Sequence, residues 1–293
     1  MYIKETLCLW CDLLGYGKPF IDSGWNLHDK RVIQNINRIN NLKVVFQNAN
    51  SFPFEKTLIM NDGFIRNMDI VHIKDGMQQN YLYWFNCILD NFYTLNRVDK
   101  QYDFPGARGV LTYGHRFDYM NNQLTLADIM QTSKENIPKY EKNILVYSPK
   151  EFQMNTAFSK AYIMESAGSE AGIVGSNLYI DIDFLERLKK IIEAGECTYY
   201  LLTDDDATRM RKEGYDVDDM GRQIVYLSTE TFQEDEFIIW QVNQKTCGKE
   251  KVLFKLWMDN KYIEFNDKGI DTKLFKLVKY KPFNEDECII EFG

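Results

Sequence analysis

The clearest feature of the chain is a short apolar run near its start that ends at a single acid. Residues 7–11 are apolar, Asp12 follows directly, and Gly15 and Gly17 come within the next five positions. An unbroken apolar run that is followed by a glycine-containing turn signal is typical of a buried strand. The pattern therefore predicts a strand that ends at Asp12 and a tight turn after it.

A second acid lies in a turn between two further apolar runs. Residues 58–60 and 64–65 are apolar, and Asn61-Asp62-Gly63 separates them. This arrangement is a hairpin signal. Hairpin geometry by itself explains Asp62, and a turn or a helix cap explains Asp12. If the strands are neighbours, however, both carboxylates lie close enough to share divalent metal ions with a triphosphate.

The spacing of apolar residues predicts the elements around these strands. A helix is expected over 25–41, a strand over 43–47, a helix over 79–98 and a strand over 109–114. The order is then strand, helix, strand, strand, helix, strand. This is the order of a ferredoxin-like α/β sandwich, an α+β fold in which helices pack on one face of an antiparallel sheet.

The later part of the chain changes in character. We expect a helix over 155–165, extended chain over 171–182, an amphipathic helix over 184–194, and short alternating strands from about residue 197. The acidic run at 204–206 is expected to form a solvated turn. These patterns predict a domain over 1–195 and a β-rich C-terminal extension of unknown role over 196–293.

Composition narrows the range of partners. The 293 residues include 43 acids and 35 bases, for a formal charge of −8. This balance disfavours broad attraction to nucleic acid or to an anionic membrane, so neither is expected as a partner. Six scattered cysteines show no zinc-binding spacing and are expected to be reduced thiols. Without a signal peptide or an apolar segment of membrane-spanning length, a cytoplasmic protein is expected.

Four segments follow one another in an informative order: Asp12 to Tyr16, Asn61-Asp62, Arg108 to Gly114, and Ala157 to Ser166. Together they resemble the motif series of the class III nucleotidyl cyclase catalytic domain. The last segment is similar to a helix of bacterial cyclase-like proteins, among them the pyrimidine cyclases of Pycsar antiphage defence. The resemblance covers about residues 5–190.

The resemblance implies a reaction and a site. A nucleoside triphosphate is cyclised to a 3′,5′-cyclic nucleotide, and pyrophosphate leaves. Asp12 and Asp62 are implied as ligands of two metal ions, Mg²⁺ or Mn²⁺. The implied phosphate-binding backbone comprises Leu13, Leu14, Gly15, Tyr16 and Gly17. Glycines permit close approach, and N–H groups at a helix start favour anions. A homodimer is also implied, with a downstream effector that responds to the product.

The chain departs from the family pattern in its base-reading position. Purine cyclases place a lysine there, four residues before the second aspartate, and this chain has Leu58. A pyrimidine substrate, UTP or CTP, is therefore favoured. Lys56 is a candidate substitute in base binding, although a lysine on a strand is ordinarily just exposed.

A second departure concerns the charge that stabilises the transition state. The later helix of the family supplies an asparagine and an arginine, and Ser159 and Ile163 take their places here. Lys160 and Arg108 are the remaining candidates, against the alternative that each is an ordinary surface charge. Two other functions stay open: a catalytically inactive cyclase-like binding or scaffold module, and a palm-like polymerase or nuclease. The negative charge argues against the second of these.

Overall fold

The computed structural model describes residues 2–47, 52, 54–71, 78–118, 152–194, 198–232, 235–243, 248–283, 285 and 288–292. The first elements are β1 (Tyr2–Leu13), α1 (Lys18–Asp22), α2 (Lys30–Gln47), β2 (Glu55–Met60), β3 (Gly63–Ile70), α3 (Gln78–Gln101) and β4 (Ala107–Asp118). They are followed by α5 (Thr156–Ala167), a 3₁₀ turn (Gly168–Ala171), β5 (Leu178–Asp181), α6 (Ile182–Ala194), β6 (Thr198–Leu201) and α7 (Asp204–Lys212). The last elements are β7 (Arg222–Phe232), β8 (Glu236–Asn243), β9 (Gly248–Met258), β10 (Ile263–Asp267), β11 (Ile270–Lys281) and β12 (Ile290–Glu291).

The described strands form one continuous sheet in the order β2-β3-β1-β4-β5-β11-β9-β8-β7-β6, and β10 and β12 pair with β11. The first four strands are antiparallel and are connected through helices in the order that the sequence predicted. β5 joins β4 in parallel, and β11 then pairs with β5 in the antiparallel direction. The α+β class is confirmed, and the C-terminal strands extend the same sheet.

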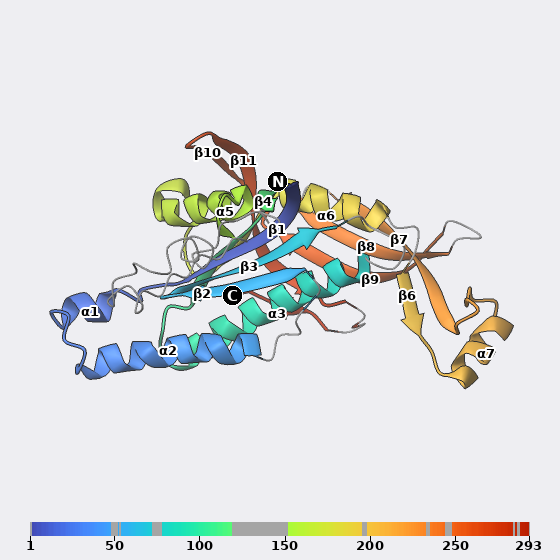
Figure 1. Cartoon of the computed structure of the whole chain (residues 1–293), viewed down its shortest axis with the longest axis horizontal. Coiled ribbons are helices and arrows are strands. Elements are labelled where there is room, and N and C mark those ends of the chain that lie inside the picture. Colours follow the sequence, from blue (N-terminus) through green and yellow to red (C-terminus); the bar gives the residue numbers. More distant parts are fainter. Residues whose placement is uncertain are drawn as a thin grey trace, which may run out of the picture.

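Side chains of β1 alternate between the two faces of the sheet. Leu7, Leu9 and Cys11 belong to the larger hydrophobic core, which contains residues of α3 and α6. Cys8 and Trp10 belong to a second core beneath α5. Figure 1 shows α5 on one side of the sheet and α2 and α3 on the other. The sequence had predicted helices on one face only; α5 covers the other.

The sequence of α5 explains why it packs there. Ala157, Ala161 and Met164 are fully buried and recur at a spacing of four and three. This spacing aligns them along one face of the helix, and the two alanines keep that face flat enough to lie close to the sheet. The free thiols of Cys8 and Cys11 lie on opposite faces, as expected from strand alternation.

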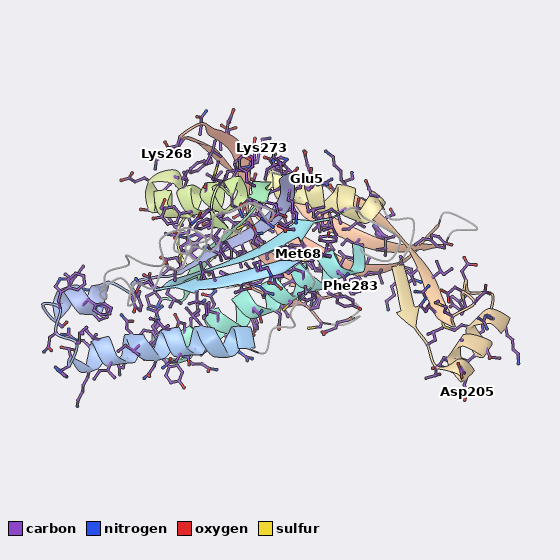
Figure 2. All side chains as sticks on the ribbon, viewed as in Figure 1. Glu5, Met68, Asp205, Lys268, Lys273 and Phe283 are labelled. Atoms are coloured by element: carbon purple, nitrogen blue, oxygen red, sulfur yellow. The ribbon has the colours of Figure 1, made fainter. Side chains whose placement is uncertain are left out.

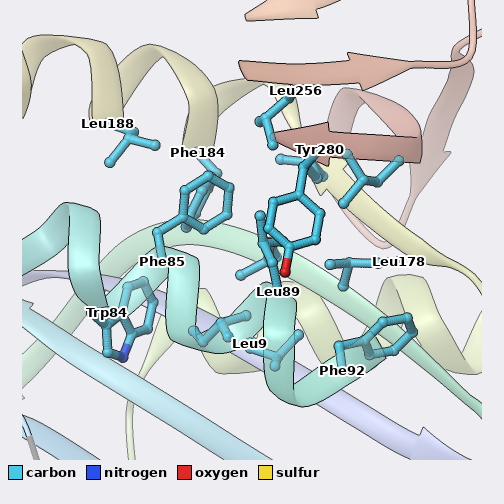
Figure 3. Packing of buried hydrophobic residues seen from close by; sticks show 14 of the residues in the cluster. Leu9, Trp84, Phe85, Leu89, Phe92, Leu178, Phe184, Leu188, Leu256 and Tyr280 are labelled. Carbon is cyan, nitrogen blue, oxygen red and sulfur yellow. The ribbon is translucent and has the colours of Figure 1, made fainter. Parts of the chain in front are cut away.

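The C-terminal strands share the larger core with the N-terminal half. The ring centroid of Phe85 on α3 lies 5.3 Å from that of Phe184 on α6 and 5.6 Å from that of Phe254 on β9. Figure 3 shows Tyr280 from β11 in the same cluster. The expected boundary between 195 and 196 lies outside the described residues. The strands on its two sides nevertheless pack on one core.

The structure corrects several local expectations, the first of them at the end of α2. α2 begins at Lys30 and continues through Gln47, so residues 43–47 are helical and not a strand. Val32, Asn35, Arg38 and Leu42 are buried at helical spacing, and this periodicity outweighs the short β-branched run that follows.

Within 171–182, only Leu178–Asp181 forms a strand, because positive φ angles at Gly172 and Gly175 turn the chain before it. The acidic run at 204–206 forms the first turn of α7 behind the capping Thr203, where helix N–H groups favour carboxylates. Among the described helices, none is both long enough and apolar enough to cross a membrane.

Candidate functional site

The site begins with Asp12 near the C-terminal end of β1. In the strand register Asp12 lies opposite Gly63 of β3 on one side and opposite Arg108 of β4 on the other. Because side chains alternate, Asp12 points to the same face of the sheet as Trp10. Its carboxylate is half-buried and accepts no hydrogen bond from another described residue. Its oxygens are therefore free to bind a cation.

Asp62 is brought to Asp12 by the hairpin turn. Asn61 adopts a left-handed φ of 51°, and its side-chain amide donates a 3.0 Å hydrogen bond to Oδ1 of Asp62. The backbone N–H of Leu13 donates a 2.9 Å hydrogen bond to the carbonyl oxygen of Asp62. The turn tip is thus tied to the residue that follows Asp12. The first strand and the hairpin lie side by side, as the sequence predicted, so the turn that carries Asp62 lies beside the end of β1.

The two acids influence each other electrostatically. The pKa of Asp12 is raised from 3.8 to about 7. Burial is the largest cause, followed by the negative charges of Asp62 and Glu165, while Arg108 and Arg38 act in the opposite direction. Both partial burial and like-charge repulsion disfavour the ionised carboxylate. A bound cation relieves this repulsion.

The donor set fits a metal ion that is shared with a ligand. Among the described residues, no group of three or more His, Cys, Asp or Glu side chains is arranged to hold a metal by itself. Mg²⁺ is commonly bound by one or two carboxylates together with substrate phosphates and water. The Asp12 carboxylate at the end of β1 and the Asp62 carboxylate in the neighbouring turn match that mode of binding.

The backbone carbonyls of the loop after β1 are engaged in hydrogen bonds within the chain. The carbonyl of Leu14 accepts from Nη1 of Arg38 at 3.2 Å, that of Gly15 from the N–H of Lys18 at 3.3 Å, and that of Tyr16 from the side-chain amide of Asn35. The N–H groups of Gly15, Tyr16 and Gly17 bond to no other described residue. These three consecutive donors are available to an anion, next to the acid pair.

A buried ion pair holds this loop in place. Arg38 on α2 and Asp99 on α3 are each 1% exposed, with 2.5 Å between Nη2 and Oδ2. Arg38 also donates to the carbonyl of Gly106 at 3.2 Å, so one side chain ties the loop after β1 to the loop before β4 at the same end of this strand pair. Tyr16 is buried on the same loop, and its φ-positive neighbour Gly15 permits the turn.

Arg108, a predicted catalytic residue, is engaged in an ion pair. Its Nη2 lies 2.6 Å and its Nε 2.9 Å from Oε1 of Glu165 on α5, and it also donates to the carbonyls of Glu165 and Ile173. Oε2 of Glu165 accepts from Nε1 of Trp10 at 3.3 Å. Sequence reasoning did not identify Glu165 or Trp10 as site residues. The pairing joins positions 57 residues apart, and no local pattern reveals it.

Lys160 is not brought to the acid pair within the chain. Its ammonium group lies 3.1 Å from Asp181 and 3.0 Å from Asp183, and it donates to the carbonyl of Tyr113. Tyr113 is five residues along β4 from Arg108, a distance of about 17 Å at the usual rise of a strand. Lys160 therefore marks a separate charged cluster on the same face of the sheet.

The two base-binding candidates lie on the face that carries Asp12. In the β2–β3 register, Lys56 lies opposite Asn67 and Leu58 opposite Ile65. Leu58 is half-buried and packs against the core that contains Trp10, whereas Lys56 is exposed. Leu58 therefore presents only hydrocarbon beside the site.

We compared the chain with known protein families, curated proteins and solved structures. Neither a scan of protein-family models nor a search of curated proteins finds a match. The chain is similar to the adenylyl cyclase CyaB from P. aeruginosa at 9% identity and a TM-score of 0.39, over 94% of this chain and 95% of that one. It is also similar to the guanylyl cyclase Cya2 at 11% identity and a TM-score of 0.40, over 99% and 98% of the two chains. Likenesses this distant do not define an activity.

Proposed function

We propose that this chain is a metal-dependent nucleotidyl cyclase. The observation that carries the proposal is the free Asp12 carboxylate held beside Asp62 on the adjacent hairpin. In the proposed reaction, the 3′-oxygen of a nucleoside triphosphate bonds to its own α-phosphorus. The bond from that phosphorus to pyrophosphate breaks, and the hydroxyl proton passes to solvent. The motif order in the sequence, which resembles class III cyclases, points to the same chemistry.

Asp12 and Asp62 are the residues that would hold the cations. When bound, divalent ions make the attacking hydroxyl more acidic and neutralise the triphosphate. The free N–H groups of Gly15, Tyr16 and Gly17 would orient the phosphate chain, since the loop's carbonyls are already engaged. Backbone donors preorganised in this way need no rearrangement when charge develops.

The positive charge for the transition state is proposed to come from a second copy of the chain. Among the described residues near Asp12, Arg108 is paired with Glu165 and Arg38 with Asp99. Lys160 lies too far along the sheet to act within its own chain. A homodimer in which α5 of one copy faces the acid pair of the other would place Lys160 in reach.

The base and the biological role are finer proposals. Leu58 offers no hydrogen-bond donor where purine cyclases have a lysine, which favours UTP or CTP. By the same resemblance, the product would be a cyclic pyrimidine nucleotide that signals to an effector in antiphage defence. We expect no nucleic-acid partner, in agreement with the negative charge of the chain.

Incubation with each of the four ribonucleoside triphosphates and Mn²⁺ or Mg²⁺, followed by mass analysis for cyclic monophosphates, tests the activity. Asp12→Asn and Asp62→Asn should each lower product formation by about 10³-fold or more, the scale of one lost electrostatic transition-state contact. Asp205→Asn is the matched control, since Asp205 lies on α7 at the end of the molecule opposite α1 (Figure 2). Undiminished turnover in either site variant would refute the assignment.

An inactive cyclase-like binding module is the alternative. It is favoured by Ser159 and Ile163, which replace the asparagine and arginine of the family pattern. The Ser159 hydroxyl donates to the carbonyl of Asn155 within the helix, and Ile163 packs against the core under α5. Neither side chain carries the amide or guanidinium donors that the family pattern supplies at these positions. Nucleotide binding that requires Asp12 and a metal ion, without any product, would establish this alternative.

A further inference from the structure

The ion pair between Glu165 and Arg108 lies beside Asp12, because Arg108 is the neighbour of Asp12 on the adjacent strand. Arg108 lies directly opposite Asp12 in the β1–β4 register, yet among the described residues its guanidinium bonds only to Glu165 and to the carbonyl of Ile173. Arg108 is 16% exposed and Glu165 is 6% exposed. A guanidinium this well surrounded has a fixed direction, and that direction is toward α5.

The bonds of Glu165 account for this direction. One carboxylate oxygen of Glu165 accepts hydrogen bonds from both Nε and Nη2 of Arg108, and the other accepts one from Nε1 of Trp10. Trp10 is held in turn by Phe158 and Tyr162, whose ring centroids lie 5.7 and 5.6 Å from its own. Glu165 is therefore fixed by two strands and by its own helix. It holds the guanidinium of Arg108 through a close ion pair.

Two carboxylates thus compete for one guanidinium. Asp12 and Glu165 are both near enough to Arg108 for its charge to act on them, but only Glu165 forms hydrogen bonds with it. Arginine and a carboxylate form strong bidentate ion pairs. Were Arg108 to pair with Asp12 instead, the oxygens proposed to bind the cation would be occupied.

We propose that Glu165 is a positioning residue that keeps Arg108 away from Asp12 and so leaves the Asp12 carboxylate free to bind a divalent cation. This inference rests on the proposed function only in taking Asp12 as a cation ligand. It assigns Arg108 a role in the charge balance of the site and not in contact with substrate. It predicts that the effect of removing Glu165 depends on the presence of Arg108.

The test is binding of Mn²⁺ alone, measured by electron paramagnetic resonance of the free ion with the full chain at pH 7.5. Glu165→Gln keeps the shape of the side chain and an acceptor for Trp10, and should weaken Mn²⁺ binding by about tenfold or more. An arginine beside an aspartate typically lowers its proton affinity by 10- to 1000-fold, and we expect a similar direction for a metal cation. Glu165→Gln combined with Arg108→Gln should bind Mn²⁺ like the wild type, because no guanidinium remains to occupy Asp12.

Glu5→Gln is the matched control. Glu5 lies on the same strand and is ion-paired with Arg187, but it is seven residues from Asp12, or about 23 Å at the usual rise of a strand. Its substitution should leave Mn²⁺ binding unchanged. Circular dichroism verifies that each variant folds. If Glu165→Gln does not fold, Arg108→Gln is the second variant, and it should bind Mn²⁺ at least as tightly as the wild type.

The proposal is overturned if Glu165→Gln binds Mn²⁺ like the wild type, or if the double variant stays as weak as the single one. A general loss of structure would produce the latter result. Weaker binding by Arg108→Gln, or a wild type that binds no Mn²⁺, also overturns it. Turnover measured on the same samples separates the two hypotheses: the predicted binding pattern without cyclic product refutes the cyclase and leaves the role of Glu165 standing.

Discussion

The backbone N–H of Leu13 donates a 2.9 Å hydrogen bond to the carbonyl oxygen of Asp62. This bond joins the end of β1 to the tip of the β2–β3 hairpin. It involves main-chain atoms only, so side-chain substitutions at Asp12 and Asp62 leave it in place. Loss of function in such variants would therefore report on the carboxylates and not on the framework that brings them together.

We expect glycine to be required at position 63 for stability, because the backbone there lies against the ring of Trp10. A Cβ atom at Gly63 would lie 2.3 Å from Cη2 of Trp10, whereas one at Gly17 would meet nothing within 4 Å. Gly63→Ala should destabilise the fold by about 1–3 kcal/mol through overpacking. Gly17→Ala should unfold like the wild type. Urea denaturation compares the two variants, and equal midpoints would contradict the prediction.

Arg38→Met should be strongly destabilising. It leaves Asp99 buried without its partner, which typically costs about 3–5 kcal/mol. It also releases the carbonyls of Leu14 and Gly106, so activity of the surviving folded protein should fall. Lys18→Met breaks the exposed pair with Asp22 and should change the free energy of unfolding by less than about 1 kcal/mol. Similar losses in both variants would show that burial of the Arg38 pair is unimportant.

The raised pKa of Asp12 predicts how stability depends on pH. Its folded-state pKa is about 7, against 3.8 for an ordinary aspartate. The folded chain then binds the proton more tightly than the unfolded chain. The resulting stabilisation is fully present below about pH 4 and is lost as the pH rises through about 7.

Asp12→Asn cannot ionise and should escape this loss. In the presence of a chelator at pH 8, its unfolding temperature should exceed that of the wild type by roughly 2 °C or more. The difference should disappear at pH 4. Thermal unfolding followed by circular dichroism at pH 4, 6 and 8 measures it. If the difference in unfolding temperature between Asp12→Asn and the wild type were the same at all three pH values, ionisation of Asp12 would not be its cause.

Competition among equimolar triphosphates should reveal the base preference. Leu58 gives the base no donor, and a site without the required partner discriminates against a base that needs one. UTP or CTP should be cyclised at least about tenfold faster than ATP or GTP, which corresponds to roughly 1.4 kcal/mol in the barrier. Leu58→Lys should reduce this ratio. A wild type that prefers a purine would refute the pyrimidine proposal and leave the cyclase proposal intact.

A chain that ends at Ala194 should aggregate. It lacks β11, the strand that pairs with the buried β5, and it lacks Phe254, which packs against Phe85 in the larger core. An unpaired strand and an exposed apolar surface both promote association. Light scattering of the purified fragment measures this. A soluble but inactive fragment would instead indicate that residues 196–293 act on the substrate or close the site.

Much of the first half of the fold was predictable because its signals are local. The apolar run before Asp12, the turn at Asn61 and the apolar spacing of α3 each depend on neighbouring residues only. The predicted strand order then placed the strand of Asp12 beside the hairpin that carries Asp62, and in the structure β1 does pair with β3 of that hairpin. The end of α2 was mispredicted because a short β-branched run is compatible with either state until burial decides.

The charge arrangement could not be predicted in the same way. Arg108 and Lys160 both looked like available bases, because a sequence shows that a residue is charged but does not show with which residue it forms an ion pair. Glu165 lies 57 positions from Arg108, and Asp99 lies 61 positions from Arg38. Such pairs depend on strand register and on how a helix packs across a sheet.

The sequence by itself determined the two acids, the glycine turn after the first strand and the α+β order, because each follows from local periodicity and turn chemistry. Only the tertiary structure decided that Arg108 is turned toward Glu165, that Lys160 lies far from Asp12 within the chain, and that the C-terminal strands continue the sheet through β11. Buried polar and charged groups need hydrogen-bond partners, and those partners come from segments distant in the chain. No single segment therefore encodes which groups will pair.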